Sequence, residues 1–156
     1  MKASLCLTGL AALLVLSAPA VFSSVAADAD SDIQNFGSEP CTKLCKVSAS
    51  KVKVPVNKTG EAKVSVSVVK GWKWNKQYPT TLKLTKVPAG LKLDKLKFKR
   101  GDFKSSNRAA SVAVKVTGTK AGKHKVTGKL NMGICDEKGC IIRVTQVQLW
   151  VEVLDK

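Results

Sequence analysis

Apolar side chains recur at every second position over most of the chain from residue 51 onward. The alternation is clear in 63–68, where valines alternate with a lysine and serines, and in 91–99, where leucines and a phenylalanine alternate with lysines. A period of two places one apolar face on each β-strand. The apolar positions of the predicted strands are Val52, Val54, Val56, Val64, Val66, Val68, Leu82, Leu84, Val87, Leu91, Leu93, Leu96, Phe98, Val112, Val114, Val116, Val126, Leu130, Met132, Ile141, Ile142, Val144, Val147, Leu149, Val151 and Val153.

Turn-forming residues separate these strands at short, regular intervals. No helical apolar period of useful length is present. Short strands at this spacing predict an all-β fold, an antiparallel β-sandwich of about seven to eight short strands. We assign this sandwich to residues 49–156. The breaks fall at Asn57-Lys58-Thr59-Gly60, Tyr78-Pro79, Pro88-Ala89-Gly90, Arg100-Gly101-Asp102, Thr117-Gly118 and Ala121-Gly122.

The first 27 residues have the pattern of a secretory signal peptide. Lys2 precedes an apolar run over 5–16, and small residues follow it. The run is too short for a membrane span and has the small-residue exit of a cleavage site. Cleavage after Val25-Ala26-Ala27 is expected, with Ala18-Pro19-Ala20 as the alternative. The pattern predicts an exported protein, periplasmic or secreted, whose mature chain has no membrane span.

Residues 28–48 are rich in Asp, Ser, Gly and Ala, and we interpret them as a flexible acidic leader that carries a cysteine pair. With the pair at the far end of the chain, the mature protein keeps four cysteines. Export favours disulfides, and three pairings are open. A zinc site is an alternative, because the spacing within each pair fits zinc half-sites. We expect disulfides, no cofactor and no metal. The four cysteines are Cys41, Cys45, Cys135 and Cys140.

The chain is strongly basic, with 27 Lys and Arg against 11 Asp and Glu and a formal net charge of +16. Such a field favours anionic partners, for example an anionic polymer of the cell envelope or an acidic protein. The lysines also have a plainer interpretation. They occupy the solvent face of each strand, where they discourage pairing between strand edges and favour a monomer.

Cys135 and Cys140 bracket four residues, Asp-Glu-Lys-Gly, that fit a type I turn between two apolar strands. Residues facing each other across such a hairpin have Cβ atoms about 4.5–5.5 Å apart, so a small adjustment allows a disulfide. The bond would close a short loop and take little entropy from the unfolded chain. Both a redox-active pair and a structural crosslink fit this pattern.

The aromatic residues concentrate in 71–79, where Trp72 and Trp74 are two apart and point the same way on a strand. Core or sheet-edge packing is the plain interpretation. The alternative is a basic, aromatic platform on which sugars or nucleic-acid bases stack. Trp150 is out of phase with its neighbours and is expected to be partly exposed. No Ser-His-Asp or Cys-His constellation, phosphate-binding loop or pair of acidic groups stands out around His124 or elsewhere.

Three segments resemble the exported N-terminal immunoglobulin-like domain of the bacterial thiol:disulfide interchange protein DsbD and its small stand-alone relatives. They are the aromatic segment 71–79, the strand 121–135, and Cys135 to Cys140 with the last strand. The resemblance covers roughly residues 49–155. It implies an immunoglobulin-like sandwich in which Cys135 and Cys140 exchange disulfides with a thioredoxin-like or other thiol protein. It also implies an aromatic cap over the cysteines, for which Phe103 is the candidate.

Two classes of function therefore remain open. One is an exported module that exchanges disulfides through the hairpin pair. The other is a non-enzymatic, disulfide-bonded basic protein that binds an anionic polymer or an acidic partner. Lys138 and Arg143 would favour a thiolate at the hairpin, whereas Asp136 and Glu137 oppose it.

Overall fold

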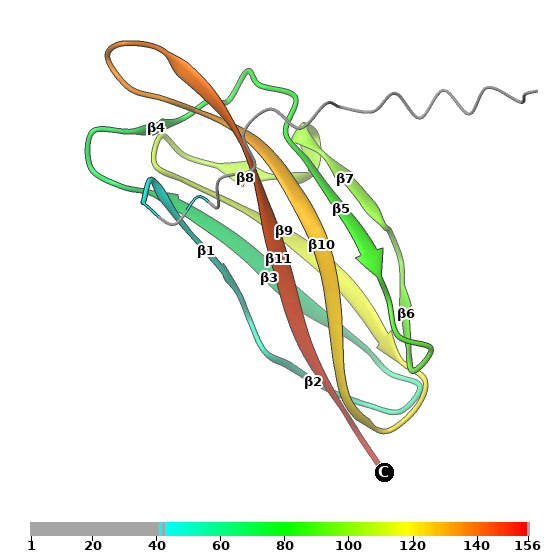
Figure 1. The fold of residues 1–156 in the computed structure, drawn as a ribbon. Helices are drawn as coiled ribbons and strands as arrows, with labels where there is room; N and C mark the ends of the chain where they lie inside the picture. The colour runs from blue at the N-terminus through cyan, green and yellow to red at the C-terminus, as the bar shows by residue number, and fades with distance from the viewer. Residues whose placement is uncertain (1–40, 42, 156) are drawn as a thin grey trace, which may run out of the picture. The chain divides into compact units, whose positions relative to one another are not determined.

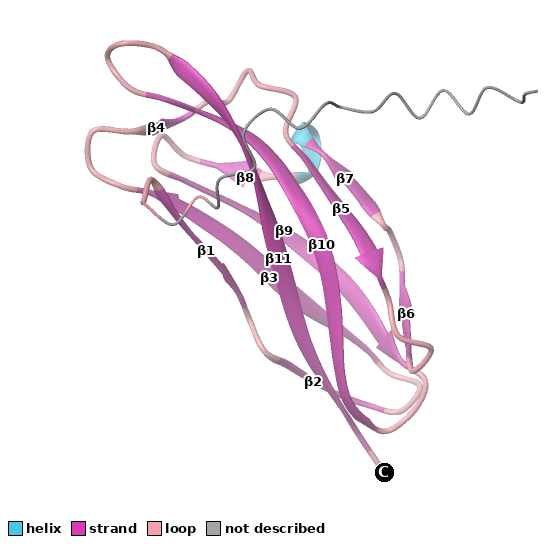
Figure 2. Cartoon of the chain, viewed as in Figure 1, coloured by secondary structure: helices cyan, strands magenta, loops and turns pink. Residues whose placement is uncertain are grey.

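The computed structural model describes Cys41 and residues 43–155. The predicted signal peptide, and the leader as far as residue 40, lie outside the described residues. The described part is built almost wholly of β-strands in two packed sheets, with a single turn of 3₁₀-helix, η1 (Arg100–Asp102) (Figures 1 and 2). The all-β prediction is confirmed. No helix in the described part is long and apolar enough to cross a membrane.

The first sheet has the strand order β1-β3-β9-β6, with β8 also paired to β9. If β1, β3, β9 and β6 take the places of strands A, B, E and D, this is the order of one sheet of the immunoglobulin fold. All pairs in this sheet are antiparallel. Its strands are β1 (Cys45–Ala49), β3 (Thr59–Val68), β6 (Leu91–Leu93), β8 (Lys104–Ser105) and β9 (Ala109–Gly118).

The second sheet has the order β2-β11-β10-β5-β7, with β4 also paired to β10. Its β5-β10-β11 part corresponds to strands C, F and G, so the molecule is an immunoglobulin-like β-sandwich. One pair departs from the predicted antiparallel pattern, because β2 runs parallel to β11. The strands are β2 (Val52–Pro55), β4 (Lys73–Trp74), β5 (Thr81–Lys86), β7 (Lys97–Lys99), β10 (Gly122–Cys135) and β11 (Cys140–Leu154).

The alternating apolar residues form the core between the sheets. Valines dominate the first sheet's inner face, and the inner face of β10 and β11 adds larger side chains such as Leu130, Met132 and Leu149, all with no exposed surface. Trp74 and Phe98 complete the layer, each 5% exposed. Burial of this kind contributes about 1.5–3 kcal/mol per large side chain, which makes the core the main source of stability.

The number and the lengths of the strands differ from the predicted seven to eight short strands. The described residues contain seven strands of four or more residues and four of only two or three. A strand of two or three residues is too short to show a period of two in the sequence, so such strands cannot be recognised from alternation alone. β10 and β11, with 14 and 15 residues, are much longer than the short strands expected. They form one continuous hairpin that extends to the cysteine pair.

Two boundaries also differ. The predicted strand 91–99 is split into β6 and β7, which belong to opposite sheets. The alternation expected over 91–99 is in fact interrupted, because the apolar positions shift by one residue between Leu93 and Leu96. In the new phase Phe98 is buried, whereas Leu96 is 52% exposed. At the other end, β1 begins at Cys45, inside the segment assigned to the flexible leader, and pairs with β3 over its whole length.

Candidate functional site

The β10–β11 hairpin projects at one end of the sandwich, with β4 beside it (Figure 1). Its register runs without a break from Gly122↔Val153 to Cys135↔Cys140. Even-numbered residues of β10, such as Ile134, face the core, so Cys135 lies on the outer face of the sheet. The predicted placement of the two cysteines opposite each other, across a four-residue hairpin turn, is confirmed.

Asp136 builds the turn at the tip. Its backbone N–H donates to the carbonyl oxygen of Gly139 at 2.9 Å. Its side-chain Oδ1 accepts the backbone N–H groups of Lys138 at 2.9 Å and Gly139 at 3.0 Å. This local use of an aspartate is the reason that Asp is favoured at the first position of such turns. The turn therefore holds the two strand ends, and the cysteines on them, face to face.

Two disulfides are present, and both join residues close in sequence. Cys135–Cys140 has a Cα–Cα distance of 4.0 Å, and Cys41–Cys45 one of 5.2 Å. Of the three pairings left open by the sequence, the structure has the one with two local bonds. It leaves no free thiolate among the four cysteines for the zinc alternative, and no group of three or more metal-ligating side chains is placed together in the described part.

The two disulfides differ sharply in exposure. Cys41 and Cys45 are 3% and 4% exposed and belong to the core. Cys140, by contrast, is exposed, and Cys135 is half-buried. A protein partner can reach only the hairpin bond without opening the fold.

The aromatic segment 71–79 runs beside the hairpin tip. β4 pairs with the end of β10, so that Lys73 lies opposite Cys135 and Trp74 opposite Ile134. The chain then continues along the outer face, where the backbone N–H of Asn75 donates to the carbonyl oxygen of Gly133 at 3.0 Å. These contacts place a lysine next to the disulfide, where its positive charge favours a thiolate.

Asn75 makes the contact closest to the disulfide. Its Oδ1 accepts the backbone N–H groups of Gln77 at 2.9 Å and Tyr78 at 3.1 Å, and its Nδ2 donates to Sγ of Cys140 at 3.8 Å. Asn75 is not among the site residues predicted from the sequence. An Asn two or three residues before a turn is a signal for the local backbone contacts, but nothing in the sequence links it to Cys140.

Tyr78 covers the outer face of β10 next to this site. Its hydroxyl donates to Oδ1 of Asn131 at 2.9 Å. Its ring lies against Gly133 so closely that a Cβ at that glycine would be 2.7 Å from the ring carbon Cγ. A glycine is therefore required here by close approach, because any larger residue would displace the ring.

The two tryptophans of the segment have different environments. Trp74 is 5% exposed and lies in the core, which confirms packing for this residue. Trp72 is half-buried against the core and lines a surface hollow with Lys73, Arg108 and Glu137. A stacking platform formed by both rings is excluded, because the ring of Trp74 is covered.

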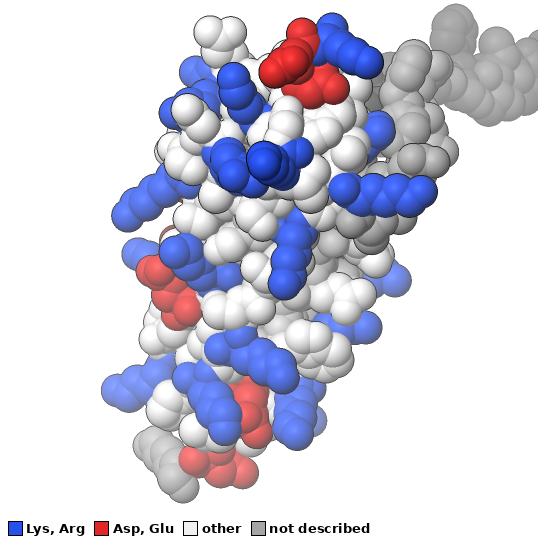
Figure 3. Space-filling view, turned by 90° about the vertical axis from the view of Figure 1, so that its left-hand side faces the viewer, with Lys and Arg blue, Asp and Glu red and all other residues white. Residues whose placement is uncertain are grey.

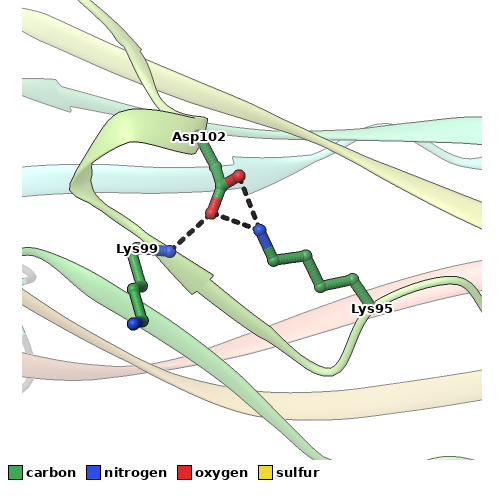
Figure 4. A network of polar contacts seen from close by, with 3 residues as sticks. All are labelled: Lys95, Lys99 and Asp102. Carbon is green, nitrogen blue, oxygen red and sulfur yellow. Dashed lines mark hydrogen bonds and ion pairs between the residues drawn. The ribbon is translucent and has the colours of Figure 1, made fainter.

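Phe103, the cap candidate, is half-buried and packs against Trp74, with 6.4 Å between ring centroids. It directly follows η1, which a charged network holds in place (Figure 4). The carboxylate of Asp102 accepts from Nζ of Lys95 at 2.6 and 2.7 Å and from the backbone N–H of Lys99 at 2.7 Å. These bonds, chiefly the one from Lys95, hold the pKa of Asp102 below its ordinary value. Phe103 thus contacts Trp74, and Trp74 is the neighbour of Lys73, the β4 residue that pairs with Cys135. The role of Phe103 as a cap stays a prediction.

A second feature lies far along β11 from the hairpin tip. Trp150 is 47% exposed, as predicted, and lines a hollow with Lys51, Lys53 and Lys123. Lys125 lies over the tryptophan ring, with Nζ 5.5 Å from its centroid. The hollow contains one acid, Glu152, which pairs with Lys53 at 3.2 Å. Elsewhere Lys and Arg side chains are spread from end to end of the face in Figure 3, with few acids among them.

No protein-family model matches the sequence, and no curated protein has a matching sequence. Among solved structures, a non-cellulosomal cohesin from Archaeoglobus fulgidus is similar at a TM-score of 0.42 and 13% identity, covering 71% of this chain and 91% of that chain. AggA, the major subunit of aggregative adherence fimbriae type I from Escherichia coli, has a TM-score of 0.35 and 12% identity, covering 70% and 95%. The CooA pilin subunit of enterotoxigenic Escherichia coli has a TM-score of 0.29 and 10% identity, covering 71% of this chain and 99% of that chain. Scores and identities this low transfer no property of those proteins to this chain.

Proposed function

We propose that this chain is an exported module that exchanges disulfides through Cys135 and Cys140 with a thioredoxin-like or other thiol protein. The observation that carries the proposal is the difference between the two disulfides. One is 3–4% exposed and part of the core. The other lies at a projecting hairpin tip with Cys140 exposed. The resemblance of the hairpin and of the segment 71–79 to the DsbD N-terminal domain supports the same reaction.

The exchange balances as a two-electron transfer. A thiolate of the reduced partner attacks Sγ of Cys140, the more exposed of the two residues, and forms a mixed disulfide. The Cys135–Cys140 bond breaks, and the sulfur of Cys135 leaves as a thiolate that takes up a proton. The second thiol of the partner, as its thiolate, then attacks the mixed disulfide and releases Cys140. The partner dithiol becomes a disulfide, and this chain gains two electrons and two protons. The reduced pair can pass them on by the reverse sequence.

The fold is suited to stay intact in both the oxidised and the reduced state of the cysteine pair. The hairpin is held by an unbroken register along β10 and β11, and β10 also pairs with β4 and β5. The disulfide closes a short loop, with a sequence separation of 5. By the loop-entropy relation such a bond is worth about 2 kcal/mol. Its loss on reduction should therefore leave the sandwich folded.

A redox titration with mass-resolved alkylation tests the proposal. We expect the 135–140 bond to be reduced by a thioredoxin-like dithiol at a potential above about −300 mV, below which structural disulfides usually lie. The buried 41–45 bond should stay oxidised under the same conditions. The variant with both Cys135→Ser and Cys140→Ser should lose exchange, and the matched control with Cys41→Ser and Cys45→Ser should keep it. Resistance of the 135–140 bond to every dithiol donor would refute exchange.

The location of the protein is part of the proposal. The signal-peptide pattern of residues 1–27 and the two disulfides support export. Mass spectrometry of the protein from the cell envelope or medium should find a new N-terminus at Asp28. A chain that retains residues 1–27 in the cytoplasm would contradict it.

A second candidate function is supported by the hollow around Trp150. We propose it as the alternative: binding of an acidic polysaccharide, with the exposed indole against a sugar ring and the lysines near its carboxylates. Binding of an oligosaccharide of hexuronic acid should weaken steeply between low and high salt, because paired lysines displace counterions. Lys123→Glu and Trp150→Ala should weaken it more than the control Lys63→Glu on β3. Equal binding by all three variants would refute this site.

A further inference from the structure

Among the described residues, one side chain directs a hydrogen-bond donor at the sulfur of the hairpin disulfide. We infer that Asn75 is a positioning residue for disulfide exchange, whose amide N–H stabilises the thiolate of Cys140. The inference rests on the proposed function, since it assigns a role within that reaction. It concerns a residue outside the cysteine pair and outside the two strands that carry the pair.

The orientation of the Asn75 amide follows from its neighbours. Its Oδ1 accepts two backbone N–H groups, those of Gln77 at 2.9 Å and Tyr78 at 3.1 Å. Those donors require an oxygen, so the NH₂ end must be the one that faces Cys140, at 3.8 Å from Sγ. A flipped amide would place N–H against N–H and an oxygen against sulfur.

The Asn75 backbone is also fixed to the strand that carries the other cysteine. Its N–H donates to the carbonyl oxygen of Gly133 at 3.0 Å. Tyr78, which donates to the Asn75 side chain, is held in turn by its hydroxyl bond to Asn131 at 2.9 Å. The donor therefore needs little reorganisation when charge develops on sulfur. Preorganised donors of this kind stabilise developing negative charge most effectively.

The chemical effect has a definite sign. A hydrogen bond to the charged form of a group favours that form, so the Asn75 amide lowers the pKa of the Cys140 thiol in the reduced protein. The thiolate is the nucleophile in exchange. A hydrogen bond to a charged group corresponds to about a tenfold change in the thiolate fraction at a pH below the pKa. Cys135 has no such donor from Asn75 and should be unaffected.

The test compares thiol reactivity in the reduced full-length protein. Asn75→Ser keeps a side-chain oxygen for the local turn, adds no charge and does not reach the sulfur. We expect it to raise the pKa of the Cys140 thiol and to slow its alkylation at neutral pH about tenfold, with the alkylation of Cys135 unchanged. Asn75→Asp keeps both bonds to the backbone N–H groups but replaces the donor by a carboxylate, and should slow Cys140 further. Gln148→Ser is the matched control, because it also replaces an exposed amide on the outer face of the same sheet but lies far along β11 from the hairpin tip, and it should leave both thiols as in the wild type.

The outcomes separate this inference from the proposed function. Wild-type alkylation of Cys140 in Asn75→Ser, with the fold intact by circular dichroism, would overturn it. An equal slowing at both cysteines would also overturn it, because that pattern reports a structural disturbance. If Cys140 alone responds but the wild type exchanges with no dithiol donor, the positioning role holds and the exchange function fails.

Discussion

Gly133→Ala is the substitution whose effect the structure defines most sharply. Gly133 is buried under Tyr78, and a Cβ there would lie 2.7 Å from Cγ, 2.8 Å from Cβ and 3.1 Å from Cδ2 of the tyrosine. Carbon atoms prefer about 3.5–4.0 Å, so the ring must move by about 1 Å. The hydroxyl bond from Tyr78 to Asn131 is 2.9 Å long and does not survive that movement.

The expected cost combines three effects. Overpacking contributes about 2 kcal/mol, and loss of the tyrosine hydrogen bond about 1 kcal/mol. Replacing a glycine by alanine in extended backbone returns about 0.7 kcal/mol by restricting the unfolded chain. The net destabilisation is about 2 kcal/mol. Because Tyr78 also donates to Asn75, the same change should disturb the donor that faces Cys140.

Urea unfolding with both disulfides intact measures this cost as a lower midpoint at constant slope. The double variant Gly133→Ala with Tyr78→Gly is the decisive control. Tyr78→Gly removes Cγ, Cβ and Cδ2, the three atoms nearest the added methyl group, so Gly133→Ala should cost little in the Tyr78→Gly background. A cost that is the same with and without Tyr78, or no cost in the wild-type background, would refute the steric reasoning.

Three further predictions concern neighbouring elements. Gly128→Ala should destabilise by about 3 kcal/mol in urea unfolding, because its Cβ would lie 2.6 Å from the backbone oxygen of Lys83, which cannot rotate away; a neutral effect would contradict this geometry. Asp102→Asn should cost about 0.5 kcal/mol at pH 7, as for exposed ion pairs, and nothing near pH 2. The sign follows because the fold holds the pKa of Asp102 below its ordinary value, so its contribution is complete at neutral pH and is lost as the pH falls below about 4; a cost that persists unchanged near pH 2 would contradict it. Phe103→Ala should destabilise by about 1 kcal/mol through its lost aromatic contact and, if the ring caps the site, should speed alkylation of reduced Cys140; an unchanged rate would remove the cap.

The alternation of apolar and polar residues predicted most of the fold because strand formation depends mainly on residues that are close in sequence. Alternation with a period of two marks which residues face the core, and those residues do form it, as Val64, Val114 and Leu149 show. Where the period was interrupted, between Leu93 and Leu96, the chain changes sheets. The interruption was visible in the sequence, but its meaning depends on which strand each half pairs with.

The candidate site divides in the same way. The hairpin with Cys135 opposite Cys140 could be predicted, since turn residues and the two cysteines are close in sequence. The neighbourhood of that hairpin could not. Asn75 is 65 residues from Cys140 along the chain and reaches it only because β4 pairs with the end of β10. A single sequence carries no signal for a contact over such a separation.

By itself, then, the amino-acid sequence determined the all-β class, the apolar face of each strand and the cysteine hairpin, because each depends on residues within one turn or one strand of each other. Only the tertiary structure decided that one disulfide is buried while Cys140 of the other is exposed, and that an asparagine amide faces its sulfur. Exposure and hydrogen bonding between distant residues follow from how the two sheets and their edge strands pack, and packing is a property of the whole chain.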